Sequence, residues 1–343
     1  HCIFERTVSV SLHIVSLERG TLPYYPDTVH PTATSAVQRR GRVRAIAFRV
    51  AARWLACCST VSARAVSPAG TFDPRVLVAP GGEQLAFATP EELLRFNSSA
   101  EQKTVKVLSR GITGATRLHL EQAGIEARVI FHDVDRKERK PKRLPNGRSV
   151  MFLRDSYSSQ VAAYRMARLL GMQNVPPTVV RVSGGAKGSA QLWIEDAMTE
   201  DIRLKEEVEL KDYNLRNQNL ADMRIFDNLI NNIDRNQGNM LVDSFGTLWL
   251  IDHTRSFGQD KVLPLPEMIT RCSNRMLAAI RSLDERTLRE ELSPYLSRVE
   301  ISALWHRRER VLERIEEAID TWGREWVLFD YGDPDPGVSV QVE

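Results

Sequence analysis

The sequence predicts an α+β fold with two lobes, a small strand-rich N-terminal lobe followed by a larger helical C-terminal lobe. Residues 105–132 and 175–194 contain short apolar and β-branched runs separated by glycine turns, a pattern typical of antiparallel strands. After Met198 the apolar residues recur mainly at helical spacing. A chain of 343 residues with 42% hydrophobic content is long enough to bury a core in each lobe. Residues 195–200, where the pattern changes, are expected to form the hinge.

The first 85 residues follow no sustained helix or strand period, and we expect residues 1–85 to be poorly structured. Within them, residues 40–65 combine a basic start, an apolar stretch and an Ala63-Arg64-Ala65 ending, as signal peptides do, although two arginines interrupt the stretch. We therefore expect a cytoplasmic protein, or an exported one if residues 40–65 are a targeting segment. No run reaches the roughly 18 apolar residues that a membrane span needs.

The N-terminal lobe is expected to cover residues 86–195 and to open with a helix, because Thr89 suits the N-cap and Pro90 the first helical position. Strands and hairpins follow. The turn at residues 110–116 contains Gly111 and Gly114, and glycines there would let backbone N–H groups approach phosphates closely.

A second helix is expected over residues 156–170, where the apolar positions fall mostly at helical spacing and Gly171 suits the position after the last turn. The C-terminal lobe, residues 196–329, should end in a long helix with an apolar stripe from Ile301 to Trp322. Residues 330–343 are expected to form a mobile tail.

Charge and cysteine content exclude some functions. The net charge is +3, and the basic residues are dispersed except at residues 136–143, which are expected to form a solvated loop between two strands. A nucleic-acid partner is therefore not expected. The four cysteines show neither disulfide nor zinc spacing.

The most informative segment is residues 226–239, followed by residues 250–253. Asp234 and Asn239 lie five positions apart in a polar loop, and Asp252 follows thirteen positions later at the end of an apolar run. Two acids and an amide at this spacing suit a hairpin folded beneath a nucleotide, and they indicate phosphoryl transfer.

These residues carry a resemblance. Asp234-Arg235 with Asn239, then Ile251-Asp252, resembles the Asp-Arg-x-x-x-Asn and Ile-Asp-x-Gly elements of phosphatidylinositol 3- and 4-kinases and their atypical relatives. Residues 155–170, ending in Val175-Pro176-Pro177, are similar to the regulatory-helix segment of secretory-pathway casein kinases and HipA-like kinases. The resemblance covers roughly residues 105–260 and implies a two-lobed, protein-kinase-like fold.

The resemblance also implies roles for the individual residues. Asp234 would take the proton of an acceptor hydroxyl, and Arg235 would anchor the loop or contact phosphate. Asn239 and Asp252 would supply oxygen ligands to magnesium, or to manganese, bound with ATP. Apart from the resemblance, His253 is expected to shape the loop rather than bind metal, and Asp227, in the preceding helix, to be a structural hydrogen-bonding residue rather than a catalytic acid.

Two positions depart from the kinase pattern. His132 stands where the phosphate-binding lysine is expected, and Gln160 stands where its glutamate partner on the helix is expected. Both would still line the nucleotide site. A nearby cation, from a set of three basic residues, would have to replace the lysine: Arg154, Arg117 or Lys106.

The leading hypothesis is an atypical kinase that uses ATP and magnesium to phosphorylate a hydroxyl of a protein, lipid, sugar or other small molecule. The alternative is a pseudokinase that binds nucleotide, or only a partner, with weak or no transfer activity. A nucleic-acid-associated protein, based on the basic run at residues 136–143, is the third hypothesis.

Overall fold

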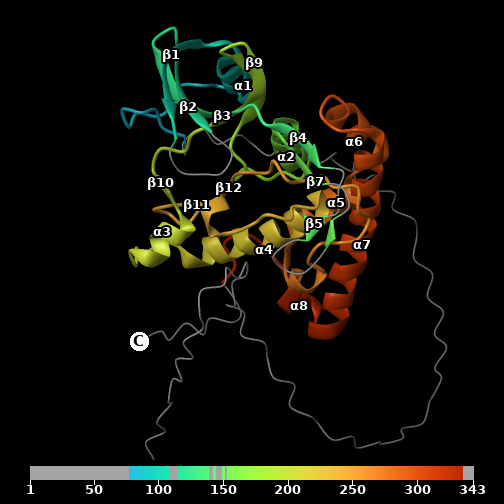
Figure 1. Ribbon diagram of the computed structural model, residues 1–343. Coiled ribbons are helices and arrows are strands. Elements are labelled where there is room, and N and C mark those ends of the chain that lie inside the picture. Colours follow the sequence, from blue (N-terminus) through green and yellow to red (C-terminus); the bar gives the residue numbers. More distant parts are fainter. Residues whose placement is uncertain (1–76, 109–114, 139–141, 144–148, 151–152, 335–343) are drawn as a thin grey trace, which may run out of the picture.

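A computed structural model describes residues 77–108, 115–138, 142–143, 149–150 and 153–334. Figure 1 shows strands β1, β2, β3 and β9 grouped in an upper lobe, with the helices α4 and α7 crossing a lower lobe. Residues 40–65 and the two turn glycines, Gly111 and Gly114, lie outside the described residues, so the predictions for them stay predictions.

The upper lobe is built on a five-stranded antiparallel sheet in the order β1-β2-β3-β9-β8. Its strands are β1 (Glu101–Val107), β2 (Thr116–Gln122), β3 (Ile125–His132), β8 (Thr178–Ser183) and β9 (Ala186–Leu192). Alternate residues such as Leu118, Val129 and Ala190 are buried in one core, as period-two side-chain alternation requires.

Helix α1 (Pro90–Ser99) covers this apolar face of the sheet. The Thr89 hydroxyl accepts a hydrogen bond from Glu92 N at 3.2 Å, and proline occupies the first turn, so the helix begins where the sequence predicted. The chain before it is more ordered than expected. Leu77 and Leu85 are buried in the same core, and an antiparallel bridge joins Val78 to Gln84, so the poorly structured segment predicted for residues 1–85 does not extend over residues 77–85.

Helix α2 (Tyr157–Leu169) lies against the other face of the sheet, where the sequence predicted a helix over residues 156–170. The Ser156 hydroxyl caps its first turn, and Gly171 follows its end with a φ of 70°. Alanines on its buried face let it pack closely against the lower-lobe core.

A narrow hairpin leads into α2. Strand β4 (Asp135–Glu138) pairs with β7 (Leu153–Ser156), and β5 (Lys142–Arg143) pairs with β6 (Ser149–Val150). The basic run at residues 136–143 is therefore partly strand, since its first residues pair with β7, and the prediction of a continuous loop was wrong there.

The lower lobe is mainly helical. Its helices are α3 (Glu200–Lys205), α4 (Tyr213–Ile230), α5 (Asn274–Ser282), α6 (Glu285–Leu292), α7 (Arg298–Trp322) and α8 (Arg324–Val327). A capping box between Ser297 and Glu300 begins α7, whose apolar stripe packs on α4 in the core. The lobe also contains the small sheet β10 (Ala197–Thr199), β11 (Met240–Asp243) and β12 (Leu248–Leu250), and the pair β13 (Cys272–Ser273) and β14 (Leu328–Phe329).

The start of the expected C-terminal tail is packed rather than mobile. The Tyr331 hydroxyl donates to buried Asp222 at 3.0 Å, and the Gln218 amide donates to the carbonyl of Asp333 at 2.9 Å. These contacts tie residues 330–333 to α4, because a buried carboxylate needs donors. The prediction of a tail from residue 330 was therefore wrong for these residues.

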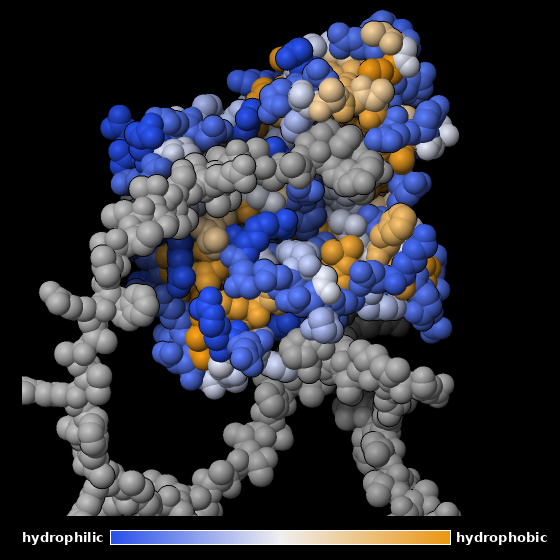
Figure 2. All heavy atoms as spheres, turned by 180° about the vertical axis from the view of Figure 1, so that it is seen from behind, coloured by the Kyte–Doolittle hydropathy of each residue, from blue (hydrophilic) through white to orange (hydrophobic). Residues whose placement is uncertain are grey.

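The surface is polar and offers no broad apolar face on the side that Figure 2 shows, where hydrophobic residues occur as patches among hydrophilic ones. The exposed large hydrophobic side chains of the described residues are dispersed over different elements, which is ordinary for a folded protein. None of the helices in the described part of the chain is long and apolar enough to cross a membrane.

Candidate active site

The polar loop after α4 is held in place by Arg235. This guanidinium pairs with both carboxylate oxygens of Asp227, from Nε at 2.8 Å and from Nη2 at 3.1 Å. It also donates to the carbonyls of Asn239 at 2.5 Å and Ile251 at 3.0 Å. The Arg235 side chain is only 9% exposed, and these bonds tie the loop to α4 and to the end of β12. Asp227 is a structural hydrogen-bond acceptor, as expected.

His253 is a further hydrogen-bond partner of the Arg235 guanidinium. The residue is fully buried, and Nη2 of Arg235 donates to its Nε2 at 2.9 Å. Burial, with a smaller contribution from the Arg235 charge, holds the pKa of His253 well below its usual range, so the ring is neutral and accepts this bond. His253 therefore shapes the loop, the role that we expected from the sequence.

The anchor brings Asn239 and Asp252 next to each other. Ile251 N donates to the carbonyl of Asn239 at 3.2 Å, which joins the end of the loop to the end of strand β12. The Asn239 side-chain amide donates to the carbonyl of Asp234 at 2.9 Å, and its side-chain oxygen accepts no bond from the described residues. Both predicted metal ligands and the predicted base thus share one small region.

Asp252 has an unusual backbone. Its φ is +54°, in the left-handed region that few residues other than glycine adopt, although Asn, Asp and His occur there more often than the rest. The Thr254 hydroxyl donates to Oδ1 of Asp252 at 3.0 Å, which fixes the carboxylate. Backbone strain of this kind is common where a side chain must be aimed at a ligand.

Asp234 is ion-paired with a residue that sequence reasoning missed. Nη1 of Arg255 donates to Oδ2 of Asp234 at 3.0 Å, and Nε of Arg255 donates to Oδ2 of Asp155 at 3.1 Å. The Asp234 side chain is 39% exposed, so it still faces solvent. Burial raises the pKa of Asp234, and the carboxylates of Asp252 and Asp155 act in the same direction, against the opposing effect of Arg255.

Asp155 is the second missed residue. It lies at the end of β7, immediately before α2, inside the segment that carried the casein-kinase resemblance. Its Oδ1 atom is buried and has no hydrogen-bond partner among the described residues. A buried carboxylate oxygen without a donor is costly, so a cation is the natural partner for it.

The acid cluster, defined here as Asp155, Asp234 and Asp252 with Arg255, carries more negative than positive charge. Three carboxylates face one guanidinium, since Arg235 is already paired with Asp227. Carboxylate and amide oxygens are the ligands that hard divalent cations prefer. The orphaned oxygen of Asp155, the charge excess and the free oxygen of Asn239 therefore fit a magnesium or manganese ion.

The protein groups would not hold such a cation alone. Among the residues that the structure describes, no group of three or more His, Cys, Asp and Glu side chains is arranged as a metal site. This suits magnesium, which binds one or two carboxylates and completes its coordination with waters and substrate phosphates.

His132 and Gln160 are the two departures from the kinase pattern. His132 lies on the sheet face that α2 covers, and Gln160 is on α2 itself. His132 pairs across strands with Ser189, whose hydroxyl donates to Oε1 of Gln160 at 3.4 Å. Gln160 in turn donates from Nε2 to Oε1 of Gln191 at 3.1 Å. The two positions are thus neighbours of one serine, but they share an uncharged network in place of an ion pair.

His132 is also a poor substitute for a lysine. It is 8% exposed, and its Nδ1 has no partner in the described residues. Burial lowers the pKa of His132, although the carboxylates of Asp252, Asp155 and Asp133 oppose this effect. The ring is therefore neutral at pH 7 and supplies no phosphate-binding charge. The neighbouring position 188 must be glycine, since a Cβ on residue 188 would lie 2.3 Å from the carbonyl oxygen of His132.

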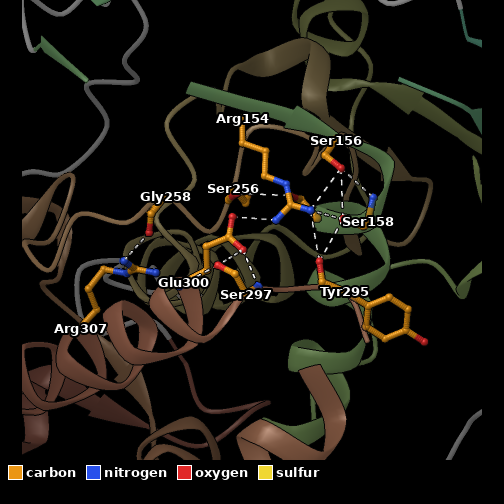
Figure 3. Close-up of polar contacts among 10 residues, drawn as sticks. Arg154, Ser156, Ser158, Ser256, Gly258, Tyr295, Ser297, Glu300 and Arg307 are labelled. Carbon is orange, nitrogen blue, oxygen red and sulfur yellow. Dashed lines mark hydrogen bonds and ion pairs between the residues drawn. The ribbon is translucent and has the colours of Figure 1, made fainter. Parts of the chain in front are cut away.

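The three basic residues that could replace the missing lysine differ in how far their side chains are already engaged in other contacts. Arg154 pairs with Glu300 at 2.7 Å and donates to the carbonyl of Tyr295 at 3.2 Å, as Figure 3 shows. It is thus committed to joining β7 to α7. Arg117 lies 5.1 Å above the Trp193 ring, and Lys106 is on the exposed edge strand β1. Arg117 is on the sheet face that also carries His132, because the two residues alternate with buried core positions.

The segment after the acid cluster is held by a second buried arginine, also seen in Figure 3. Arg307 of α7 donates to the carbonyl of Gly258 at 3.0 Å, the contact drawn in Figure 3. It also donates to the carbonyls of Leu229 at 2.8 Å and of Asp260. Burial lowers the pKa of Arg307 to about 9. Leu229 is in the last turn of α4, where carbonyls favour a cation.

This combination of lobes, anchored loop and acidic hairpin defines a kinase-like fold. Fam20 from hydra, solved with a sugar, superimposes with a TM-score of 0.53 at 19% identity, over 71% of this chain and 93% of that chain. The Golgi casein kinase with Mn and ADP bound gives a TM-score of 0.50 at 17% identity, over 71% of this chain and 80% of that chain. The predicted two-lobed α+β fold and its resemblance to secretory-pathway casein kinases are thus confirmed at the level of fold. No family model matches the chain, and no curated protein sequence matches it.

Proposed function

We propose that the protein is an atypical kinase that binds ATP with magnesium or manganese and transfers the γ-phosphoryl group to a hydroxyl. The observation that carries the proposal is the acid cluster, in which Asp155 has an orphaned buried oxygen and Asp252 is held in a strained backbone conformation. Such uncompensated negative charge beside a solvent-exposed acid is costly for stability alone and has a clear use in phosphoryl transfer. The fold that this chain shares with a casein kinase crystallised with Mn and ADP supports the same choice of ligands.

Each residue then has a definite task. Asp252 and Asn239 would hold the cation, with Asp155 close by. Asp234 would accept the proton of the acceptor hydroxyl as the oxygen–phosphorus bond to the acceptor forms and the bond to ADP breaks. Arg255 keeps Asp234 oriented, and Arg235 with His253 fixes the loop. The cation, when bound, neutralises phosphate charge.

The acceptor hydroxyl could belong to a protein, a lipid, a sugar or another small molecule. A sugar deserves to be tested first, because the hydra Fam20 structure with a similar fold was solved with one. This likeness concerns the fold, and the acceptor site of this chain must be found by experiment.

A second function is favoured by a specific observation, the neutral network around His132 and Gln160. Without a lysine and glutamate pair, the α- and β-phosphates lose an anchor, and the protein would bind nucleotide with weak or no transfer. This pseudokinase alternative uses the same acid cluster but predicts no labelled product.

Calorimetric titration of ATP with magnesium or manganese tests nucleotide binding, and a screen with γ-labelled ATP tests transfer. The informative variant is Asp252→Asn, since asparagine tolerates the left-handed backbone while removing the charge. Loss of a residue that only supports a metal ligand weakens metal binding by about tenfold or more. Asp252 is proposed to be a ligand itself, so we expect Asp252→Asn to weaken metal-dependent ATP binding by more than about tenfold.

Arg286→Gln is the matched control, because Arg286 is 77% exposed on α6 and belongs to an ordinary surface pair. Absence of ATP binding by the unaltered protein with either metal would refute both functions. Binding without a labelled product, across protein, lipid and sugar acceptors, would favour the pseudokinase alternative.

A further inference from the structure

A cavity of about 290 Å³ lies apart from the acid cluster, between α2, the connection from α2 to β8, the β11–β12 hairpin and the start of α4. None of its lining residues belongs to the acid cluster or to the network of His132 and Gln160. Its size is near the lower end of the range for small-molecule sites, about 300 Å³.

The floor of the cavity is apolar. Met172, Val175, Pro177 and Trp249 line it and are buried side chains. The indole nitrogen of Trp249 already donates to Asp243 at 3.1 Å, so its ring presents only an apolar surface to the cavity. An aromatic or alkyl group would therefore be well accommodated there.

Two arginines at the rim give the cavity a positive charge. Arg168, in the last turn of α2, and Arg275, at the start of α5, both line it. Neither guanidinium has an ion pair or hydrogen bond to a residue that the structure describes. Arg275 lies 4.7 Å above the ring of Tyr331, whose hydroxyl is bound to Asp222, so the stacked guanidinium keeps its donors free.

A lining that combines buried apolar side chains with two guanidiniums, of exposed Arg275 and half-buried Arg168, is complementary to a small amphipathic anion. We propose that this cavity binds a small organic anion, a carboxylate or phosphate monoester with an aromatic or alkyl body. The anionic group lies between Arg168 and Arg275, where bidentate hydrogen bonds are available, and the body packs on Trp249.

The walls of the cavity are formed by elements that also carry or lead to residues of the candidate active site. Asn174 donates from its amide to the carbonyl of Leu248 at 2.8 Å and accepts from Leu250 N at 2.8 Å, so this wall is bound to β12, which leads to Asp252. The opposite wall is α2, which carries Gln160. The two sites are separate, and an anion here leaves the nucleotide site accessible.

The test is calorimetric titration of the full chain with indole-3-acetate, in the absence of nucleotide, with tryptophol as the uncharged analogue. We expect saturable binding of the acid and at least about tenfold weaker binding of the alcohol, since charge-assisted hydrogen bonds contribute more than neutral ones. The variant Arg168→Gln with Arg275→Gln should weaken indole-3-acetate binding by about tenfold. The control Arg286→Gln should bind it unchanged.

Thr247→Phe provides a second, steric test, because Thr247 lines the cavity and is only partly buried. It should abolish binding, with thermal unfolding used to show that the variant is folded. Failure of indole-3-acetate to bind, equal binding of the alcohol, or displacement of the acid by ATP and magnesium would each overturn the proposal. Because nucleotide is absent from the titrations with the acid and the alcohol, their outcomes are independent of whether the protein is a kinase; the competition with ATP and magnesium is a separate measurement.

Discussion

Arg255 holds Asp234, the proposed base, in an ion pair of 3.0 Å, and the same guanidinium reaches Asp155 at 3.1 Å. One cation thus joins the catalytic loop to the strand that precedes α2. This strand leads directly into α2, the helix that carries Gln160.

Replacing Arg255 by glutamine is expected to change both proton and metal affinity. The Arg255 charge opposes the rise in the pKa of Asp234, so its removal should raise that pKa further. The acidic limb of the pH–rate profile should then move to higher pH, because the base must be deprotonated to act. Manganese affinity, measured by electron paramagnetic resonance, should rise about fivefold, since one more negative charge is left uncompensated.

Arg286→Gln serves as the control for this variant, because it removes an arginine of equal charge from a remote surface pair. An unchanged pH profile with unchanged manganese affinity would show that Arg255 does not control Asp234.

Asp234→Asn is expected to stabilise the protein at neutral pH. The pKa of Asp234 is raised in the folded state, so folding is favoured while the group is protonated and loses stability as the pH rises through the folded-state pKa. The variant does not ionise and avoids this loss. Its advantage in urea unfolding should therefore be full near pH 7 and should shrink as the pH falls below about pH 4, where both states of the unaltered protein increasingly hold the proton.

Asp227→Asn is the matched comparison, since it makes the same chemical change seven positions earlier. It breaks the buried pair with Arg235 and should cost about 3 kcal/mol or more at pH 7. If both variants destabilise the protein alike, Asp234 is a structural residue and the assignment as a base is wrong.

Restoring the kinase pair by His132→Lys with Gln160→Glu is expected to tighten ATP binding by about tenfold, because an anchored ammonium binds phosphate through charge-assisted bonds. Each single change should destabilise the protein. A lysine alone would place a buried charge without the helix partner, and a glutamate alone would face Oε1 of Gln191.

The double-mutant cycle should then show a favourable coupling of about 0.5 to 3 kcal/mol in thermal unfolding. Additive destabilisation and weaker ATP binding would mean that the neutral network of His132 and Gln160 has a role of its own.

Arg154→Gln should lower stability without affecting nucleotide affinity. Its side chain is 12% exposed and its partner Glu300 is 9% exposed, so breaking this pair should cost about 3 kcal/mol. ATP titrations of the variant should agree with the unaltered protein, because Arg154 faces α7. A clear loss of ATP affinity in a folded variant would identify Arg154 as the cation that replaces the lysine.

The fold class and several helices could be predicted from the sequence, because helix caps and apolar spacing depend on residues that are close together in the chain. The cap of α1 depends on Thr89 and Pro90, and α2 depends on apolar spacing that ends at Gly171. The loop between Asp234 and Asn239 was identified by spacing alone, and the structure places both residues beside Asp252.

The rest of the site depends on contacts between distant parts of the chain. Asp155 and Arg255 are 100 positions apart, and their pairing follows from how β7 meets the loop after β12. Arg154 looked free in sequence because Glu300 is 146 positions away. Charge partners of this kind leave no periodic pattern, and only the fold brings them together.

The buried guanidinium of Arg307 has a mechanical consequence. It joins the end of α4 to the segment at residues 258–260. Moving that segment outward would break hydrogen bonds from the buried Arg307 guanidinium to carbonyl oxygens, which is costly where water cannot replace them. The floor beneath the acid cluster should therefore move with the helices as one rigid block. Rotation of the upper-lobe sheet and α1 relative to this block would then centre on residues 195–200, the predicted hinge.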